Sequence, residues 1–108
     1  MARLDRTFEA VWAQIQRGIA PGDKIRNWTR DKGYLGDDFT IQAVEARFVK
    51  ANSPGAATIQ HVAREEFAKV YAHWNGYNAG TVRRHELRDI TRFSKYVISI
   101  LHHVLNAA

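Results

Sequence analysis

Basic side chains are concentrated near the C-terminal end of this chain, in the run TVRRHELRDITRFSKYVISILHHVL at positions 81 to 105. The run contains five of the sixteen lysine and arginine residues, and only Glu86 and Asp89 oppose them. Contacts to the phosphates of a nucleic acid are made largely by such side chains. We therefore predict four phosphate-binding arginines in this run: Arg83, Arg84, Arg88 and Arg92.

The final helix predicted in this run carries a narrow polar stripe among aliphatic residues. Lys95, Ser99 and His102 recur at spacings of four and three, and Asn106 continues the stripe, so these side chains share one helix face. A recognition helix offers a face of this size to the major groove, where short polar side chains reach base edges. We expect the stripe to face solvent, with Val97, Leu101 and Val104 facing the core. The alternative is a core helix whose one wet face is polar.

The run ELRDITRFSKYVISILHHV resembles the helix-turn-helix of winged-helix domains, in which a short helix leads into a serine-basic-tyrosine start and an aliphatic recognition helix. A similar entry occurs in the C-terminal winged-helix repeats of the selenocysteine-specific elongation factor. The resemblance covers residues 81–105 and implies DNA binding. A winged helix continues into a β-hairpin wing, whereas this sequence ends at Ala108, so a wing would have to come from the preceding sheet. The residues that match the family's entry are Ser94, Lys95, Tyr96, Ile100 and Leu101.

The elements that must position this run are predicted from apolar periodicity. Spacings of three and four predict a helix over residues 4–19 that Pro21 and Gly22 terminate. Short alternating runs predict strands at 24–29, 39–44, 48–51 and 58–62, with a polar loop at 31–38 and turns at 45–47 and 52–55. Helical spacing returns at 64–77, and Thr81 and Ser94 are placed to cap two further helices.

These elements predict one α+β domain spanning residues 1–108. It consists of an N-terminal helix, a small antiparallel β-sheet of three to four strands, and three helices that end in a helix-turn-helix-like pair. Short alternating strands cannot stabilise themselves, so the sheet must pack on helices. We expect one common core that contains Trp12, Phe67, Trp74 and Leu101.

Other chemistries are poorly supported by the residue spacing. The five histidines form no HExxH, HxH or HxxE pattern, and the adjacent His102 and His103 point to different sides of a helix. The acidic residues Asp37, Asp38 and Glu45 are a weak basis for a nuclease, so we expect no enzyme, no cofactor and no bound metal. Near phosphates, His102 should gain a proton more easily and strengthen binding below about pH 6.5.

Four aromatic residues allow two interpretations: Trp28, Tyr34, Trp74 and Tyr77. They could form a pocket for a flipped base or a small ligand. Aromatic residues at such spacing more often belong to the core. Tyr34 lies in a glycine-rich segment between charged residues, which makes it the first candidate for a pocket position.

The composition bounds the remaining choices. A net charge of +5 and a pI near 9.9 favour a polyanionic partner, and the chain has no cysteine and no apolar run of the roughly 20 residues that cross a bilayer. We therefore expect a cytoplasmic, non-catalytic module that binds nucleic acid, preferentially duplex DNA, as a regulator or as the targeting module of a restriction or mobile-element system. A homodimer is expected because a single DNA-binding helix pair usually needs one for specificity. The alternative is a protein-interaction module that uses the aliphatic final helix, and a small nuclease or ligand-binding enzyme ranks lowest.

Overall fold

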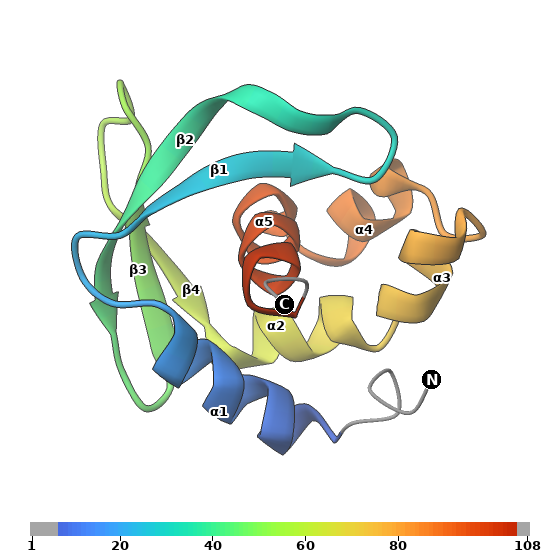
Figure 1. The fold of residues 1–108 in the computed structure, drawn as a ribbon, viewed down its shortest axis with the longest axis horizontal. Coiled ribbons are helices and arrows are strands. Elements are labelled where there is room, and N and C mark those ends of the chain that lie inside the picture. Colours follow the sequence, from blue (N-terminus) through green and yellow to red (C-terminus); the bar gives the residue numbers. More distant parts are fainter. Residues whose placement is uncertain (1–6, 106–108) are drawn as a thin grey trace.

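The computed structural model describes residues 7–105, which form nine elements (Figure 1). They are α1 (Phe8–Gly18), β1 (Lys24–Thr29), β2 (Gly33–Val44), β3 (Phe48–Asn52), β4 (Gln60–Ala63), α2 (Arg64–Tyr71), α3 (Trp74–Ala79), α4 (Arg84–Ile90) and α5 (Ser94–Leu105). The predicted α+β class is confirmed: one helix precedes a four-stranded antiparallel sheet, and helices follow it.

The sheet is an antiparallel meander with the strand order β1-β2-β3-β4. Thr29 pairs with Gly33 across a three-residue connection, and Gly33 supplies the positive φ of 71° that such a turn requires. The predicted polar loop at 31–38 is therefore wrong beyond Lys32, because residues 33–38 already belong to β2. These residues form a strand because they pair with β1, and the polar composition of the segment does not show that pairing.

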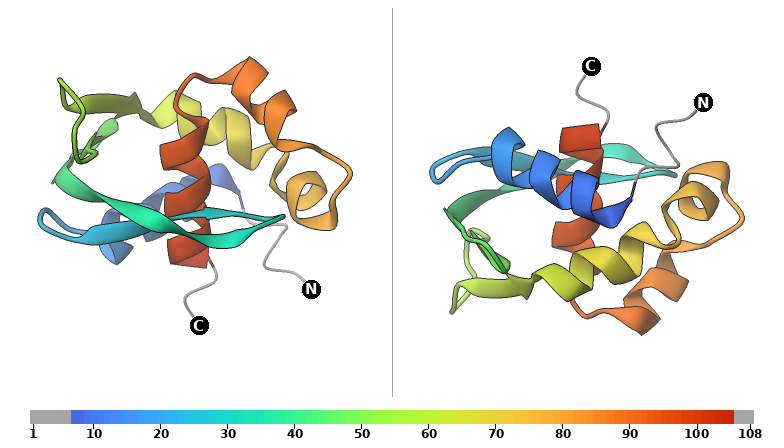
Figure 2. Two further views of the ribbon diagram at one scale, coloured as in Figure 1. Left: turned by 90° about the horizontal axis from the view of Figure 1, so that it is seen from above. Right: turned by 90° about the horizontal axis from the view of Figure 1, so that it is seen from below.

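Helix α5 lies at the centre of the molecule. It packs against β1 on one side and against α1 and α2 on the others, while the sheet curls around it (Figures 1 and 2). A helix that is apolar on nearly every face is typically buried. The core prediction is confirmed, because Trp12, Phe67, Trp74 and Leu101 all belong to one buried cluster. Val97, Leu101 and Val104 face that core as expected.

The segment predicted as one helix over 64–77 is split into α2 and α3. The chain turns at His73, whose backbone leaves the helical region (φ −111°, ψ 11°) and whose amide donates to the Val70 carbonyl. Thr81 also differs from its predicted role, since its hydroxyl donates to the Gly76 carbonyl at 3.2 Å and closes α3. Arg83 stands at the start of α4 instead, where its amide donates to the Glu86 carboxylate at 3.2 Å.

Within residues 7–105, no helix is long and apolar enough to cross a membrane.

Candidate functional site

Ser99 in the middle of the polar stripe is buried, and Lys95 and His102 are only partly exposed, so the expected solvent-facing stripe is wrong for these three residues; Asn106 lies outside the described residues. Ser99 is only 2% exposed, and its Oγ accepts a hydrogen bond from the Trp28 amide at 3.0 Å. The His102 ring stacks on the Trp28 indole, with 3.7 Å between ring centroids and 7° between planes. Lys95 is half-buried, and its Nζ donates to Ser53 Oγ at 3.4 Å. Because β1 covers this face, α5 cannot enter a major groove as it stands.

The contact between Ser99 and Trp28 yields a stability prediction. Ser99→Ala removes the acceptor of a partly buried amide, which should lower the free energy of unfolding by about 1 to 3 kcal/mol. Urea denaturation measures this decrease, and hydrogen exchange at the Trp28 amide should accelerate in the variant. A decrease below about 0.5 kcal/mol with unchanged exchange at Trp28 would contradict the assigned bond.

A bulge interrupts the ladder between β1 and β2 beside this contact. Arg26 pairs with Asp38 and Trp28 pairs with Tyr34, so Asn27 alone faces residues 35–37 of β2. The register between β1 and β2 shifts here, and the Trp28 amide donates its hydrogen bond to Ser99 of α5. Bulges are common next to functional sites because they redirect side chains.

A cavity of about 140 Å³ opens at the bulge, between β1, β2 and the start of α5. Asn27 lies in its wall and is only 2% exposed, yet its Nδ2 and Oδ1 have no hydrogen-bond partner among the described residues. The same holds for the buried Nε of Arg84. Buried polar groups are nearly always hydrogen-bonded to protein or to ordered water, so these three atoms leave hydrogen-bonding capacity for a polar group beside the cavity. The lining residues are Asn27, Trp28, Thr29, Leu35, Asp37, Arg84, Lys95 and Ser99.

The unpartnered amide predicts a stabilising substitution. Asn27→Leu replaces a desolvated amide by an apolar side chain of similar size, which should leave the free energy of unfolding unchanged or raise it by up to about 2 kcal/mol. Chemical denaturation of the ligand-free protein tests this expectation. A destabilisation of more than about 1 kcal/mol would mean that the Asn27 amide is hydrogen-bonded within the folded protein.

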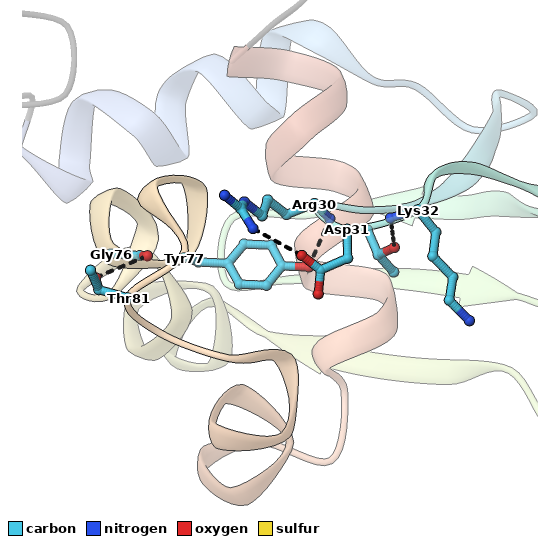
Figure 3. A network of polar contacts seen from close by, with 7 residues as sticks. Arg30, Asp31, Lys32, Gly76, Tyr77 and Thr81 are labelled. Atoms are coloured by element: carbon cyan, nitrogen blue, oxygen red, sulfur yellow. Dashed lines mark hydrogen bonds and ion pairs between the residues drawn. The ribbon is translucent and has the colours of Figure 1, made fainter.

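A larger cleft of about 300 Å³ adjoins this cavity and shares Thr29, Leu35 and Arg84 with it. It adds Asp31, Lys32, Tyr77 and Arg88. Tyr77 comes from α3 and reaches the β1–β2 connection, where its hydroxyl oxygen accepts a hydrogen bond from the Arg30 amide at 3.0 Å (Figure 3). Burial raises the pKa of Tyr77, so the phenol keeps its proton at neutral pH. We call the cavity and the cleft together the hairpin cleft.

The hairpin cleft has a positive charge. Its lining contains four cations, Lys32, Arg84, Arg88 and Lys95, against the two carboxylates Asp31 and Asp37. Asp31 is paired with Arg30 at 3.0 Å, whereas none of the four cations forms an ion pair within residues 7–105. Concave surfaces lined by one sign of charge focus the electrostatic field and attract ligands of the opposite sign.

Four of the seven sequence-predicted site residues therefore lie together in the hairpin cleft: Arg84, Arg88, Lys95 and Ser99. Arg83 is exposed at the start of α4, and Arg92 is exposed in the turn before α5, where its guanidinium carbon lies 5.1 Å from the Phe93 ring centroid. His102 does not line the hairpin cleft and lies against the Trp28 ring instead.

The aromatic residues divide between core and surface. Trp74 and Tyr77 are buried and lie 6.4 Å and 6.3 Å from the Trp28 ring, so both belong to the core. Tyr34 is 55% exposed and lies beside Arg26, whose guanidinium carbon is 5.0 Å from the ring centroid. The four side chains do not enclose a common aromatic pocket, although Trp28 and Tyr77 both line the hairpin cleft.

Burial lowers the pKa of His102, and the neighbouring His103 adds to this shift. In the free protein His102 therefore gains a proton less easily than an exposed histidine, and the easier protonation expected near phosphates stays a prediction. Because the folded state holds this proton less tightly than the unfolded state, His102 stabilises the fold above its ordinary pKa of about 6.5. That stability is lost as the pH falls through the lowered pKa.

The shift at His102 can be tested with a variant that keeps the ring stack. His102→Phe removes the titrating group and retains an aromatic ring against Trp28. The free energy of unfolding should fall more steeply in the parent protein than in this variant between about pH 7.5 and pH 5. Parallel pH profiles would show that the folded state does not lower the pKa of His102.

Several residues of the hairpin cleft were not predicted from the sequence, namely Asn27, Thr29, Asp31, Lys32 and Leu35. The sequence of β1 contained one indication of this site. In KIRNWT, Asn27 and Thr29 lie on the same face of the strand as Ile25, so two polar side chains occupy positions that are usually apolar in a core strand. The bulge itself follows from pairing with a distant segment and left no local signal.

No group of histidine, aspartate or glutamate side chains within residues 7–105 is arranged to hold a metal ion. Comparison of the chain with protein-family models, with curated proteins and with solved structures finds no match. The resemblance to winged-helix domains thus stays a prediction, and the function has to be inferred from the hairpin cleft.

Proposed function

We propose that this protein is a non-catalytic DNA-binding module that holds the phosphate backbone in the hairpin cleft. The observation that carries the proposal is the convergence of Lys32, Arg84, Arg88 and Lys95, none of them ion-paired within residues 7–105, on a concave surface that also contains an unpartnered buried amide. Cations that form no ion pair keep their charge available to attract an anionic ligand.

A nucleic acid fits this surface better than a single small anion does. The cations are spread over the β1–β2 connection, α4 and the start of α5, and the exposed Arg83 and Arg92 extend the positive surface along the same helix pair. Such a spread matches a ligand with repeated charges, and phosphate contacts supply most of the affinity of DNA-binding proteins. Duplex and single-stranded DNA both offer these contacts.

The route to DNA differs from that of a helix-turn-helix protein. Helix α4 and the first turn of α5 would meet the phosphates. The rest of α5 would stay in the core and support the cleft. A role as a regulator or a targeting module, and a homodimer that doubles the contact surface, are part of the same proposal. The alternative of a protein-interaction module required an accessible aliphatic face on α5, and β1, α1 and α2 cover that helix.

Fluorescence anisotropy with short duplex and single-stranded oligonucleotides tests the proposal. Affinity should fall between about 50 and 200 mM salt, with a slope of log affinity against log salt of about −2 to −4 for three or four phosphate contacts. The absence of saturable binding to either form at about 50 mM salt, or a slope near zero, would exclude this function.

A further inference from the structure

The unpartnered atoms of the hairpin cleft define what kind of group it can receive. Asn27 offers two N–H donors and one carbonyl acceptor side by side, and the Nε–H of Arg84 is a further donor. A ligand that satisfies them must present an acceptor next to a donor. The edge of a nucleobase has this pattern, and asparagine forms paired hydrogen bonds with such edges.

The size of the cavity limits the ligand further. A volume of about 140 Å³ is close to that of the roughly 150 Å³ cavity that accepts one benzene ring. One six-membered ring fills this volume, whereas a fused two-ring purine would extend beyond it into the adjoining cleft. The backbone amide of Trp28 is held by Ser99, which fixes this wall of the cavity.

We propose that the cavity at the bulge binds one unstacked pyrimidine base of the DNA held in the hairpin cleft. The inference depends on the proposed function, because the phosphate contacts bring the base to the cavity. Arg84 lines both parts of the hairpin cleft, so it stands between the base and the neighbouring phosphate. Lys32 and Arg88 line the larger cleft, where the phosphate would be held.

An unstacked base is available in single-stranded DNA at a lower cost than in a duplex. In a duplex it must be extruded, which costs a few kcal/mol unless the base is mismatched or damaged. The protein should therefore prefer single strands, or duplexes with a mismatched pyrimidine, over perfect duplexes.

Anisotropy measurements on four single-stranded probes of equal length test the inference: oligo(dT), oligo(dC), oligo(dA) and an abasic oligonucleotide. The parent protein should bind the two pyrimidine probes about tenfold or more tightly than the abasic probe, the order of effect expected for one bound base. Asn27→Leu should bring this ratio close to one while leaving the salt dependence unchanged. The control Arg88→Ala should weaken binding to all four probes alike.

The outcomes separate the inference from the proposed function. Equal affinity of the parent for all four probes, or an unchanged ratio in Asn27→Leu, would overturn the base-binding cavity while the salt-dependent binding remained. Absence of saturable binding to every probe and to a duplex of the same length would instead remove the proposed function. Circular dichroism confirms the fold of each variant, and Asn27→Ala replaces Asn27→Leu if the latter does not fold.

Discussion

Trp74→Ala should lower the free energy of unfolding by about 3 to 5 kcal/mol, the range for a buried aromatic residue. Trp74 is 1% exposed, and its ring centroid lies 5.8 Å from that of Tyr77 and 6.4 Å from that of Trp28. Truncation therefore leaves a cavity between α3 and the strand that forms the hairpin cleft. Urea denaturation followed by circular dichroism measures the change.

An exposed aromatic residue provides the control for Trp74. Tyr34 is 55% exposed on β2, so Tyr34→Ala should change the free energy of unfolding by no more than about 0.5 kcal/mol. If Trp74→Ala melted within a degree or two of the parent protein, the assignment of Trp74 to the core would be wrong.

Replacing Arg84 and Arg88 together by alanine should weaken binding to all DNA sequences alike. Both side chains line the larger of the two parts of the hairpin cleft, and neither forms an ion pair within residues 7–105. For each phosphate that the variant no longer binds, the slope of log affinity against log salt should shrink by about 0.9 on duplex DNA, or about 0.7 on a single strand. Anisotropy titrations at several salt concentrations give both affinity and slope.

The matched control removes the same charge from another part of the surface. Arg17 at the end of α1 and Arg47 in the β2–β3 turn are exposed and line neither part of the hairpin cleft. The double variant Arg17→Ala and Arg47→Ala has the same net charge as the double variant of Arg84 and Arg88. This control should keep the slope of the parent protein. If the slope and the affinity decreased equally in both double variants, DNA binding would depend only on the net charge of the protein and not on the hairpin cleft.

The sequence indicated the elements better than it indicated the site. The apolar residues of the short run KIRNWT predicted β1 with the observed bounds, and the apolar periodicity of the helices predicted a core that contains Trp12, Phe67 and Leu101. The helix 94–105 was located correctly but its polar stripe was misinterpreted. The stripe that Lys95, Ser99 and His102 form is narrow enough for one strand to lie against it. The nearly continuous apolar character of α5 was the stronger signal.

The site depends on contacts between distant segments. Asn27 and Arg84 are 57 positions apart in sequence, and only the fold brings both residues to the cavity beside the bulge between Arg26 and Trp28. Local composition reports charge and periodicity but not the register between strands. For this reason the arginine cluster was predictable, whereas the cavity that it borders was not.

The central claim is that the hairpin cleft is the functional site, and an NMR titration tests it most directly. The Nδ2–H₂ signals of Asn27 and the Nε–H signal of Arg84 report on the atoms that lack partners within residues 7–105 of the free protein. Titration of a pyrimidine-rich single-stranded oligonucleotide should shift these signals and leave the backbone amides of Arg17 and Arg47 unchanged. Shifts confined to α1 and the β2–β3 turn, with the Asn27 and Arg84 signals unmoved at saturation, would contradict the assignment of the hairpin cleft as the functional site.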